Sequence, residues 1–409
     1  MAVETGEVPE GSAQGSPAGP SSDGPVLLAT MLRRAMTVGI ATHMTQVVEV
    51  LQGRGVPARI VRPTWPAPLP NAALIAPTTV LRRLSRSERA VLWDRAMYQR
   101  LLEQGLRRAF QAGSPPRLVY AQDPRSAAAA LKVRGNAPVP VVMVFHSNDS
   151  QAQELIDRGL IAAGGRSDRL IREFEAALFP RLDGMVFVSE YMRERMVAAV
   201  PALADVPSAV VPNFLEEEPV TGVPVDPATP SGDCITVGSL VDRKNHEYLL
   251  EVLAAARRQG QTPSLTVVGH GPLRAHLEAR AKALGVADQV VFTGSRSDVP
   301  DLLRRHRVYV HSATMENLPY ALIEAFRAGL PVVAGRVGGI GELVGDEETG
   351  RFWPLDDPVA GARVLTSLLT DAPALEGAAR RASQVFEERY SVSAAGDALA
   401  DFLMLSAAR

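Results

Sequence analysis

Residues 312–350 read SATMENLPYALIEAFRAGLPVVAGRVGGIGELVGDEETG, and the pattern of this stretch indicates how the chain folds. A short apolar run, Val308–His311, comes directly before it, and a second run, Pro331–Ala334, lies inside it. Both runs are too short for a stable helix, whereas the residues between them have helical spacing. Strand, helix and strand in this order form the unit from which buried parallel sheets are built.

The same alternation continues away from this stretch. Short apolar runs rich in Val and Ile recur, and amphipathic stretches with helical spacing lie between them. The further runs are Pro25–Thr30, Ala58–Val61, Leu118–Ala121, Val139–His146, Met185–Ser189, Ala209–Pro212, Cys234–Gly238, Leu265–Gly269 and Val290–Gly294. The clearest helices are Thr42–Gly53, Ser85–Gly113, His246–Gln259 and Leu273–Leu284. The pattern predicts an α/β fold with parallel sheets buried on both faces.

Residues 216–232 divide the alternation into two series, because they are acidic, rich in proline and without periodicity. Such a segment is typical of a linker between domains. We therefore predict two doubly wound, Rossmann-like domains with a cleft where the carboxyl ends of both sheets face each other and ligands bind. The predicted parts are a disordered leader over 1–24, an N-terminal domain over 25–217, a linker over 218–232 and a C-terminal domain over 233–391.

The composition excludes several classes of protein. The 43 Lys and Arg residues nearly balance the 45 Asp and Glu residues, which leaves no basic footprint for nucleic acid. The single cysteine, Cys234, excludes an internal disulfide framework and a zinc cluster of cysteines. No apolar run reaches the ~18 residues of a membrane-spanning helix, and the start of the chain lacks the features of a secretory signal. We expect a cytoplasmic protein.

One segment raises the question of membrane contact. The predicted helix Ser85–Gly113 and the residues before it carry many arginines, and an Arg-rich face could touch anionic lipid. Such a face is more often only solvated, and we expect no membrane contact. The arginines in question are Arg82, Arg83, Arg86, Arg89 and Arg95.

Two carboxylates stand out within residues 312–350. Glu316 and Glu324 are eight residues apart, and between them Pro319 sits where a first helical turn should begin. Free backbone N–H groups around Asn317–Tyr320 would then offer a site for a diphosphate. Carboxylates beside that site would repel phosphate, so they make sense as acceptors of hydrogen bonds from sugar hydroxyls.

This stretch resembles a known family. The spacing Glu-x7-Glu, followed by Ala-Gly-x-Pro-Val-Val-Ala and by Gly-Gly-x-x-Glu-x-Val, is similar to the retaining group 1 glycosyltransferases of GT-B fold. The resemblance extends through the C-terminal half and is thinner in the N-terminal half. It rests further on Gly238-Ser239-Leu240 with Lys244, Val267-Val268-Gly269-x-Gly271-Pro272, Val291-Phe292-Thr293-Gly294, His146, Val188-Ser189-Glu190 and Val211-Pro212-Asn213.

The resemblance implies roles for particular residues. It implies that the C-terminal domain binds the donor, that Glu324 holds the ribose hydroxyls, and that Lys244 neutralises the diphosphate as the glycosidic bond breaks. It also implies that Glu316 and His146 lie at the transferred sugar, His146 from the acceptor-binding N-terminal domain. The donor-binding candidates are Gly238, Ser239, Arg243, Lys244, Gly269, Gly271, Phe292, Asn317, Leu318 and Glu324. The last helix, 392–409, should pack back on the N-terminal domain.

The chain departs from the family pattern in two places. Ser239 stands where the family often has arginine, which removes a bidentate phosphate ligand that the neighbouring Arg243 can replace. The family's first loop is rich in glycine and commonly ends in histidine, whereas this chain has only Gly39 and then His43. We treat Gly39 and His43 as candidate acceptor or loop residues. Ser189 and Glu190 suggest a helix cap and a first-turn charge.

The resemblance implies a retaining glycosyltransferase that uses a nucleotide-diphosphate sugar, and we expect UDP, GDP or dTDP as the nucleotide and a small molecule or glycan as acceptor. No Asp-x-Asp pair is present, so we expect no metal and no other cofactor. The resemblance implies front-face attack, in which the leaving phosphate takes the acceptor proton. Two alternatives remain open: a nucleotide-sugar epimerase of the same fold, and a non-catalytic nucleotide-sugar-binding homologue.

Overall fold

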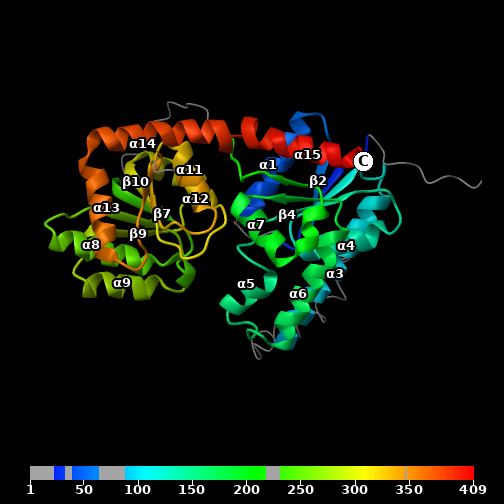
Figure 1. Ribbon diagram of the computed structural model, residues 1–409, viewed down its shortest axis with the longest axis horizontal. Coiled ribbons are helices and arrows are strands. Elements are labelled where there is room, and N and C mark those ends of the chain that lie inside the picture. The colour runs from blue at the N-terminus through cyan, green and yellow to red at the C-terminus, as the bar shows by residue number, and fades with distance from the viewer. Residues whose placement is uncertain (1–22, 33–38, 64–87, 218–230, 346–347) are drawn as a thin grey trace, which may run out of the picture.

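The computed structural model describes residues 23–32, 39–63, 88–217, 231–345 and 348–409, and these residues form two domains side by side (Figure 1). The predicted leader up to residue 22, the linker from 218 to 230 and the arginines at 82, 83 and 86 lie outside the described residues. Two parallel six-stranded sheets with flanking helices confirm the predicted pair of doubly wound domains.

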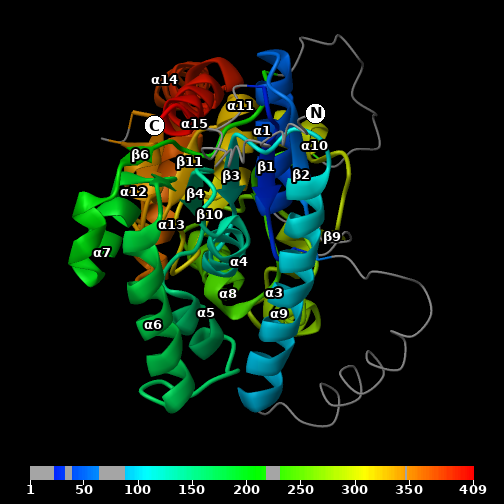
Figure 2. The same cartoon turned by 90° about the vertical axis from the view of Figure 1, so that its right-hand side faces the viewer.

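The N-terminal domain is built on a sheet with strand order β2-β1-β3-β4-β5-β6. Its strands are β1 (Val26–Ala29), β2 (Ala58–Val61), β3 (Leu118–Ala121), β4 (Val141–Phe145), β5 (Gly184–Phe187) and β6 (Ser208–Val210). Its helices are α1 (Gly39–Gly53), α3 (Glu88–Gln111), α4 (Pro124–Arg134), α5 (Gln151–Asp157), α6 (Arg166–Leu178) and α7 (Glu190–Ala199). Figure 2 shows α3, α5 and α6 extending below the sheet.

The four central strands β1, β3, β4 and β5 are buried on both faces, which explains why they are continuously apolar. Leu28 points into a core that contains Met44 of α1, whereas its neighbour Leu27 points into the opposite core with Leu102 of α3. The first of these cores also contains Leu318 and Leu322 of the second domain. The two domains therefore share apolar packing as well as polar contacts.

The C-terminal domain has strand order β12-β11-β10-β7-β8-β9. Its strands are β7 (Gly232–Val237), β8 (Leu265–Val268), β9 (Val290–Gly294), β10 (His306–His311), β11 (Val332–Ala334) and β12 (Gly350–Phe352). Its helices are α8 (His246–Arg258), α9 (Arg274–Ala283), α10 (Val299–Arg304), α11 (Tyr320–Arg327), α12 (Ile340–Val344), α13 (Pro358–Thr370) and α14 (Ala372–Val385).

The edge strand β12 has no counterpart among the predicted apolar runs. It is only three residues long, Gly350–Phe352, and its middle residue is Arg351, so it has no apolar pattern. Pairing with β11 places it, and a Cβ on Gly350 would lie 1.8 Å from the carbonyl oxygen of Val332. Glycine is therefore needed there for close backbone contact, which a local pattern does not reveal.

The end of the chain returns to the N-terminal domain. In Figure 1, α14 runs along the top of the C-terminal domain and leads to α15 (Asp397–Ala407) on the N-terminal domain. Leu399 and Leu403 of α15 line the same small apolar gap as Val47 and Leu51 of α1. Arg54 adds ion pairs to two aspartates of α15. Among the described helices, none combines the length and the apolarity that crossing a membrane requires.

Candidate functional site

A loop of the C-terminal domain carries the first candidate carboxylate. This loop follows β10, and Pro319 is the residue just before α11, with extended backbone angles of φ −75° and ψ 135°. The helix therefore begins at Tyr320, one residue later than the prediction that placed Pro319 in its first turn. Glu316 lies in the loop with a side chain that is only 8% exposed, and Glu324 lies inside the helix.

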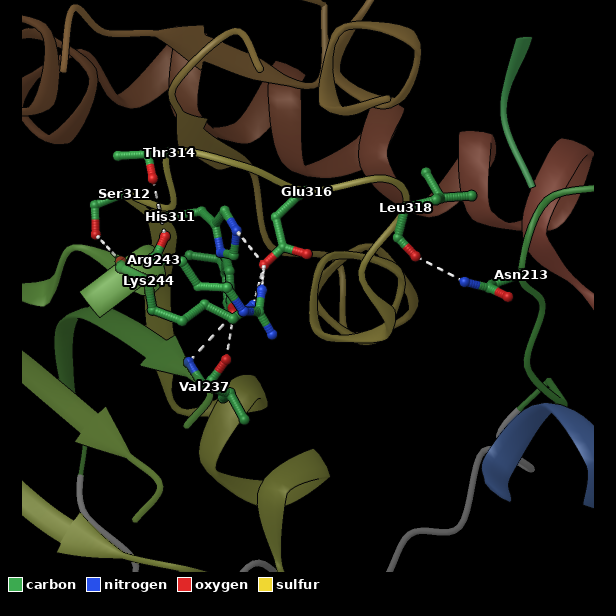
Figure 3. A network of polar contacts seen from close by, with 10 residues as sticks. Asn213, Val237, Arg243, Lys244, His311, Ser312, Thr314, Glu316 and Leu318 are labelled. Atoms are coloured by element: carbon green, nitrogen blue, oxygen red, sulfur yellow. Dashed lines mark hydrogen bonds and ion pairs between the residues drawn. The ribbon is translucent and has the colours of Figure 1, made fainter. Parts of the chain in front are cut away.

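Two cations converge on Glu316 (Figure 3). Lys244 and Arg243 end a short helical turn after β7, and both side chains contact Oε1 of Glu316, Arg243 at 3.2 Å. The two loops are also joined through the backbone, because Ser312 Oγ donates to the carbonyl oxygen of Lys244 at 2.9 Å. The Lys244 side chain is 12% exposed, so its charge is largely shielded from water. The structure thus brings together three residues that the sequence placed at the donor.

Histidine 311 completes this cluster, although the sequence analysis did not single it out. His311 is the last residue of β10, and its Nε2 lies 3.8 Å from Oε1 of Glu316. Burial, followed by the charges of Lys244, His246 and Arg243, holds the pKa of His311 well below its usual value. The imidazole is therefore neutral at neutral pH. We refer to Arg243, Lys244, His311 and Glu316 as the cation cluster.

Glu324 lies on the other side of this loop, within α11. It is half-buried. Burial, and after it the charge of Glu324, raises the pKa of Tyr320. Burial also raises the pKa of Tyr309; a hydrogen bond to the backbone of Val237 opposes this rise, and the charge of Glu324 adds to it. The hydroxyl of Tyr309 exchanges hydrogen bonds with the backbone of Val237, at the carboxyl end of β7. Glu324 is therefore close to the strand ends that present Lys244 and Glu316.

Close backbone packing requires glycine at Gly269 and Gly271, two of the predicted donor-binding residues. Gly269 has a φ of +142°, and a Cβ there would lie 1.8 Å from the carbonyl oxygen of Gly238. A Cβ on Gly271 would lie 2.3 Å from the carbonyl oxygen of Leu240. The loops after β7 and β8 pack so closely that no side chain fits between them. Ser239 is exposed beside Gly238, and Phe292 of β9 lies 6.0 Å from the guanidinium of Arg274.

The N-terminal domain contributes a pair of histidines. His146 follows β4, and its ring meets that of His43 edge to face at 4.7 Å between centroids. Burial lowers the pKa of His146 to about 4, and burial together with His146 lowers that of His43. Both rings are therefore neutral at neutral pH. His43 lies one turn inside α1, because that helix begins at Gly39, three residues earlier than predicted.

Neighbouring side chains of β3 and its following loop orient this pair. Tyr120 Oη lies 3.2 Å from Nε2 of His43, and Gln122 Oε1 lies 3.2 Å from Nε2 of His146. The Gln122 amide nitrogen donates to the carbonyl oxygen of Tyr120 at 3.5 Å, so its oxygen faces His146. His146 then carries its proton on Nε2. Sequence pattern gave no signal for Tyr120, which lies within an ordinary apolar strand, or for Gln122, which lies in the loop directly after it.

Polar contacts join the carboxyl ends of the two sheets. The Asn317 side chain accepts a hydrogen bond from Ser189 at 2.5 Å and donates to the carbonyl oxygen of Ser147 at 3.3 Å. Asn213 donates to the carbonyl oxygen of Leu318 at 2.7 Å (Figure 3). The loop that carries Glu316 is therefore bound directly to the domain that carries His146. Gly39 joins this interface too, because a Cβ there would lie 2.9 Å from the ring of Tyr320.

Glu342, the glutamate of the Gly-Gly-x-x-Glu motif, makes two further contacts between the domains. Its carboxylate accepts hydrogen bonds from the backbone N–H groups of Glu190 at 3.0 Å and Tyr191 at 2.6 Å. These are the first residues of α7, so Glu342 binds a helix N-terminus of the other domain, where negative charge is favoured. Ser189 caps the same helix by accepting from Met192, which confirms the predicted cap.

Glu342→Gln is expected to lower the free energy of unfolding by about 1 kcal/mol, because the neutral amide interacts less favourably with the N-terminus of α7. Urea-unfolding midpoints of the variant and the wild type provide the measurement. Glu376→Gln is the matched control, since Glu376 is 73% exposed on α14. Equal midpoints for both variants would contradict a stabilising role of Glu342 between the domains.

The interpretation of Arg95 as part of a solvated face is wrong. Arg95 points inward toward Gln151, and the carboxylates of Asp123, Glu154 and Glu175 act on it. Burial lowers the pKa of Arg95 and raises that of Glu175 to about 7. The side chain of Arg95 therefore belongs to a buried polar network between α3, α5 and α6.

Within the described ranges, no three His, Cys, Asp or Glu side chains gather closely enough to hold a metal ion.

The two halves of the chain match known families. Residues 228–385 match the family described as Glycosyl transferases group 1, and residues 38–218 match the one described as Glycosyltransferase Family 4. The alpha-D-kanosaminyltransferase of Streptomyces kanamyceticus is 32% identical over 166 residues, 40% of this chain and 43% of the relative.

A second relative is the GDP-mannose-dependent alpha-(1-6)-phosphatidylinositol monomannoside mannosyltransferase of Mycobacterium tuberculosis. It is 31% identical over 242 residues, 54% of this chain and 61% of the relative. The chain thus spans about half the length of these relatives.

Solved structures share the whole arrangement. Anabaena HepE in complex with UDP superposes with a TM-score of 0.68 at 16% identity, over 93% of this chain and 100% of that one. Sucrose-phosphate synthase from Thermosynechococcus elongatus superposes with a TM-score of 0.69 at 17% identity, over 94% of this chain and 100% of that one. At such identities the likeness establishes the fold, two facing Rossmann-like domains.

Proposed function

Because residues 228–385 match the group 1 glycosyltransferases, residues 38–218 match Glycosyltransferase Family 4 and the fold is GT-B, we propose that the chain transfers a sugar from a nucleoside diphosphate to the hydroxyl of an acceptor. The observation that carries the proposal is the cation cluster at the carboxyl end of the second sheet, where ligands of doubly wound domains bind. Two relatives named as glycosyltransferases support the reaction class.

Lys244 and Arg243 would supply positive charge that stabilises the leaving diphosphate. Breaking the bond between the sugar and the diphosphate places additional negative charge on the phosphate, and a shielded cation stabilises that charge better than an exposed one. Lys244 has such a position, whereas Arg243 is 49% exposed and can move toward the ligand. We propose that these two residues replace a divalent metal ion. Glu324 would then hold the ribose hydroxyls and Glu316 the hydroxyls of the sugar.

We propose that the anomeric configuration is retained. In the front-face route, the acceptor oxygen bonds to the anomeric carbon on the side from which the diphosphate leaves, and the departing phosphate oxygen takes the acceptor proton. No enzyme carboxylate is needed as a nucleophile. His146 would contact the sugar or the acceptor hydroxyl from the N-terminal domain, as a neutral imidazole. The acceptor would be a small molecule or a glycan.

A thermal-shift screen tests the proposal. The nucleotide of the donor should raise the unfolding temperature by several degrees at saturation, because a ligand that binds only the folded state stabilises it by mass action. UDP, GDP, ADP, dTDP and their sugar conjugates are the ligands to compare. The shift should persist with EDTA and disappear in Glu324→Ala, whereas Glu376→Ala on exposed α14 should keep it.

Two results of this screen, and one of a separate assay, would contradict parts of the proposal. Absence of any shift would contradict the proposed donor, whereas a shift without turnover across many acceptors would favour a non-catalytic nucleotide-sugar-binding homologue. A shift abolished by EDTA would replace the proposed cations by a metal. Incubation of the stabilising nucleotide-sugar without acceptor distinguishes a transferase from an epimerase. An epimerase would convert the sugar, whereas a transferase would only hydrolyse the nucleotide-sugar slowly.

A further inference from the structure

A bound diphosphate would change the balance of charge in the cation cluster. In the structure, Lys244 and Arg243 both contact the same oxygen of Glu316, so two positive charges face one negative charge. A bound nucleotide-sugar would bring two further negative charges to the same cations. Glu316 would then share its partners, although its side chain is only 8% exposed and water cannot replace them.

His311 is the group placed to compensate Glu316. Its Nε2 is buried, has no hydrogen-bond partner among the described residues and lies 3.8 Å from Oε1 of Glu316. Buried polar nitrogens normally have partners, so an unpartnered one asks for an explanation. Shortening this distance by slightly less than an ångström, to about 3 Å, would make a hydrogen bond to the carboxylate. The imidazole side chain is 3% exposed and its ring stacks on Tyr309, which holds it in position.

We propose that His311 is a positioning residue for donor binding, which donates a hydrogen bond from Nε2 to Glu316 when the diphosphate draws Lys244 and Arg243 away. The inference rests on the proposed function, because it requires a diphosphate at Lys244. Without ligand, Nε2 of His311 has no hydrogen-bond partner among the described residues, and Glu316 forms ion pairs with Lys244 and Arg243. With ligand, His311 keeps the carboxylate in place, so that it faces the sugar rather than turning back to the cations.

This arrangement predicts an effect that separates ligand binding from stability. His311→Leu should weaken the binding of UDP or GDP about 10- to 100-fold, the effect of losing a hydrogen bond to a charged group. The unfolding temperature without ligand should stay the same or rise, because an unpartnered buried nitrogen is removed. His311→Gln, whose amide N–H can replace Nε2, should bind within about threefold of the wild type. A merely structural histidine would lower stability and affinity together.

A double-mutant cycle measured by calorimetry with UDP, and with GDP in parallel, is the decisive experiment. In a Glu316→Gln background, His311→Leu should change the affinity less than about twofold, because no carboxylate remains to be held. His276→Leu, at a histidine 57% exposed on α9, serves as the matched control and should bind like the wild type. If the wild type binds and His311→Leu binds equally well, the inference fails alone. If His311→Leu is as harmful without Glu316, it also fails. If the wild type binds neither nucleotide, the proposed function fails as well.

Discussion

Lys244→Met is expected to lower the rate of nucleoside diphosphate release from the nucleotide-sugar, with water as the acceptor, by about 1000-fold. The lysine is 12% exposed, so its charge acts on the leaving phosphate with little screening by solvent. Methionine keeps the length and apolar stem of the side chain but removes the charge. The initial rate of nucleotide release, followed by chromatography, measures the effect.

Two further variants distinguish lost catalysis from lost folding. Lys244→Met leaves Glu316 with Arg243 as its remaining charged partner at Oε1, so it should also lower the unfolding temperature. The double variant Lys244→Met/Glu316→Gln should recover stability but not activity. Lys282→Met, at an exposed lysine in the last turn of α9, is the control and should keep full activity. A rate for Lys244→Met within tenfold of the wild type would rule out the proposed role of this cation.

Gly338→Ala is expected to lower the free energy of unfolding by about 3 kcal/mol, through overpacking against backbone and an unfavourable φ. Gly338 has a φ of +53°, and a Cβ there would lie 1.7 Å from the carbonyl oxygen of Glu316. Because the neighbour is backbone rather than a flexible side chain, the loop that carries Glu316 has to move. Donor binding should therefore fall together with stability, as measured by urea unfolding and nucleotide titration.

Gly285→Ala separates the two causes of this loss. Gly285 has a φ of +71°, but a Cβ there would meet nothing within 4 Å. Its substitution should cost only the ~1 kcal/mol of the unfavourable backbone conformation and leave nucleotide binding unchanged. If both alanine variants lose the same stability and both bind nucleotide normally, then the contact between Gly338 and the Glu316 loop is not important.

Much of the fold could be predicted from local pattern. The runs Ala58–Val61, Leu118–Ala121 and Val290–Gly294 match β2, β3 and β9 residue by residue. All four residues of β3 are buried, which requires an apolar run, whereas β2 and β9 are partly exposed edge strands whose β-branched residues still favour a strand. The start of α1 was predicted three residues late, since Gly39 and Ile40 carry no capping signal. The three-residue strand β12 was missed, because its pairing with β11 compensates for its lack of an apolar pattern.

Some residues of the candidate site could likewise be predicted from the sequence, and others could not. Lys244 and Glu316 could be found in the sequence because each belongs to a motif of neighbouring residues, and the structure brings them into contact. His311, Gln122 and Glu342 could not be assigned a role, since their partners are Glu316, His146 and the start of α7. Glu342 in particular belongs to a recognisable motif, but nothing in that motif shows that its carboxylate contacts another domain.

The sequence by itself determined the two alternating series of strands and helices, their division near residues 216–232, and the family motif around Glu316 and Glu324. Each depends on interactions between residues close in the chain or on burial, which apolarity records directly. Only the tertiary structure decided that Lys244 and Arg243 share one oxygen of Glu316, with His311 beside it, and that the loop of Glu316 is bound to the opposite domain. Those contacts join residues as many as 170 positions apart, as between Asn317 and Ser147, and no local periodicity encodes which distant side chains meet.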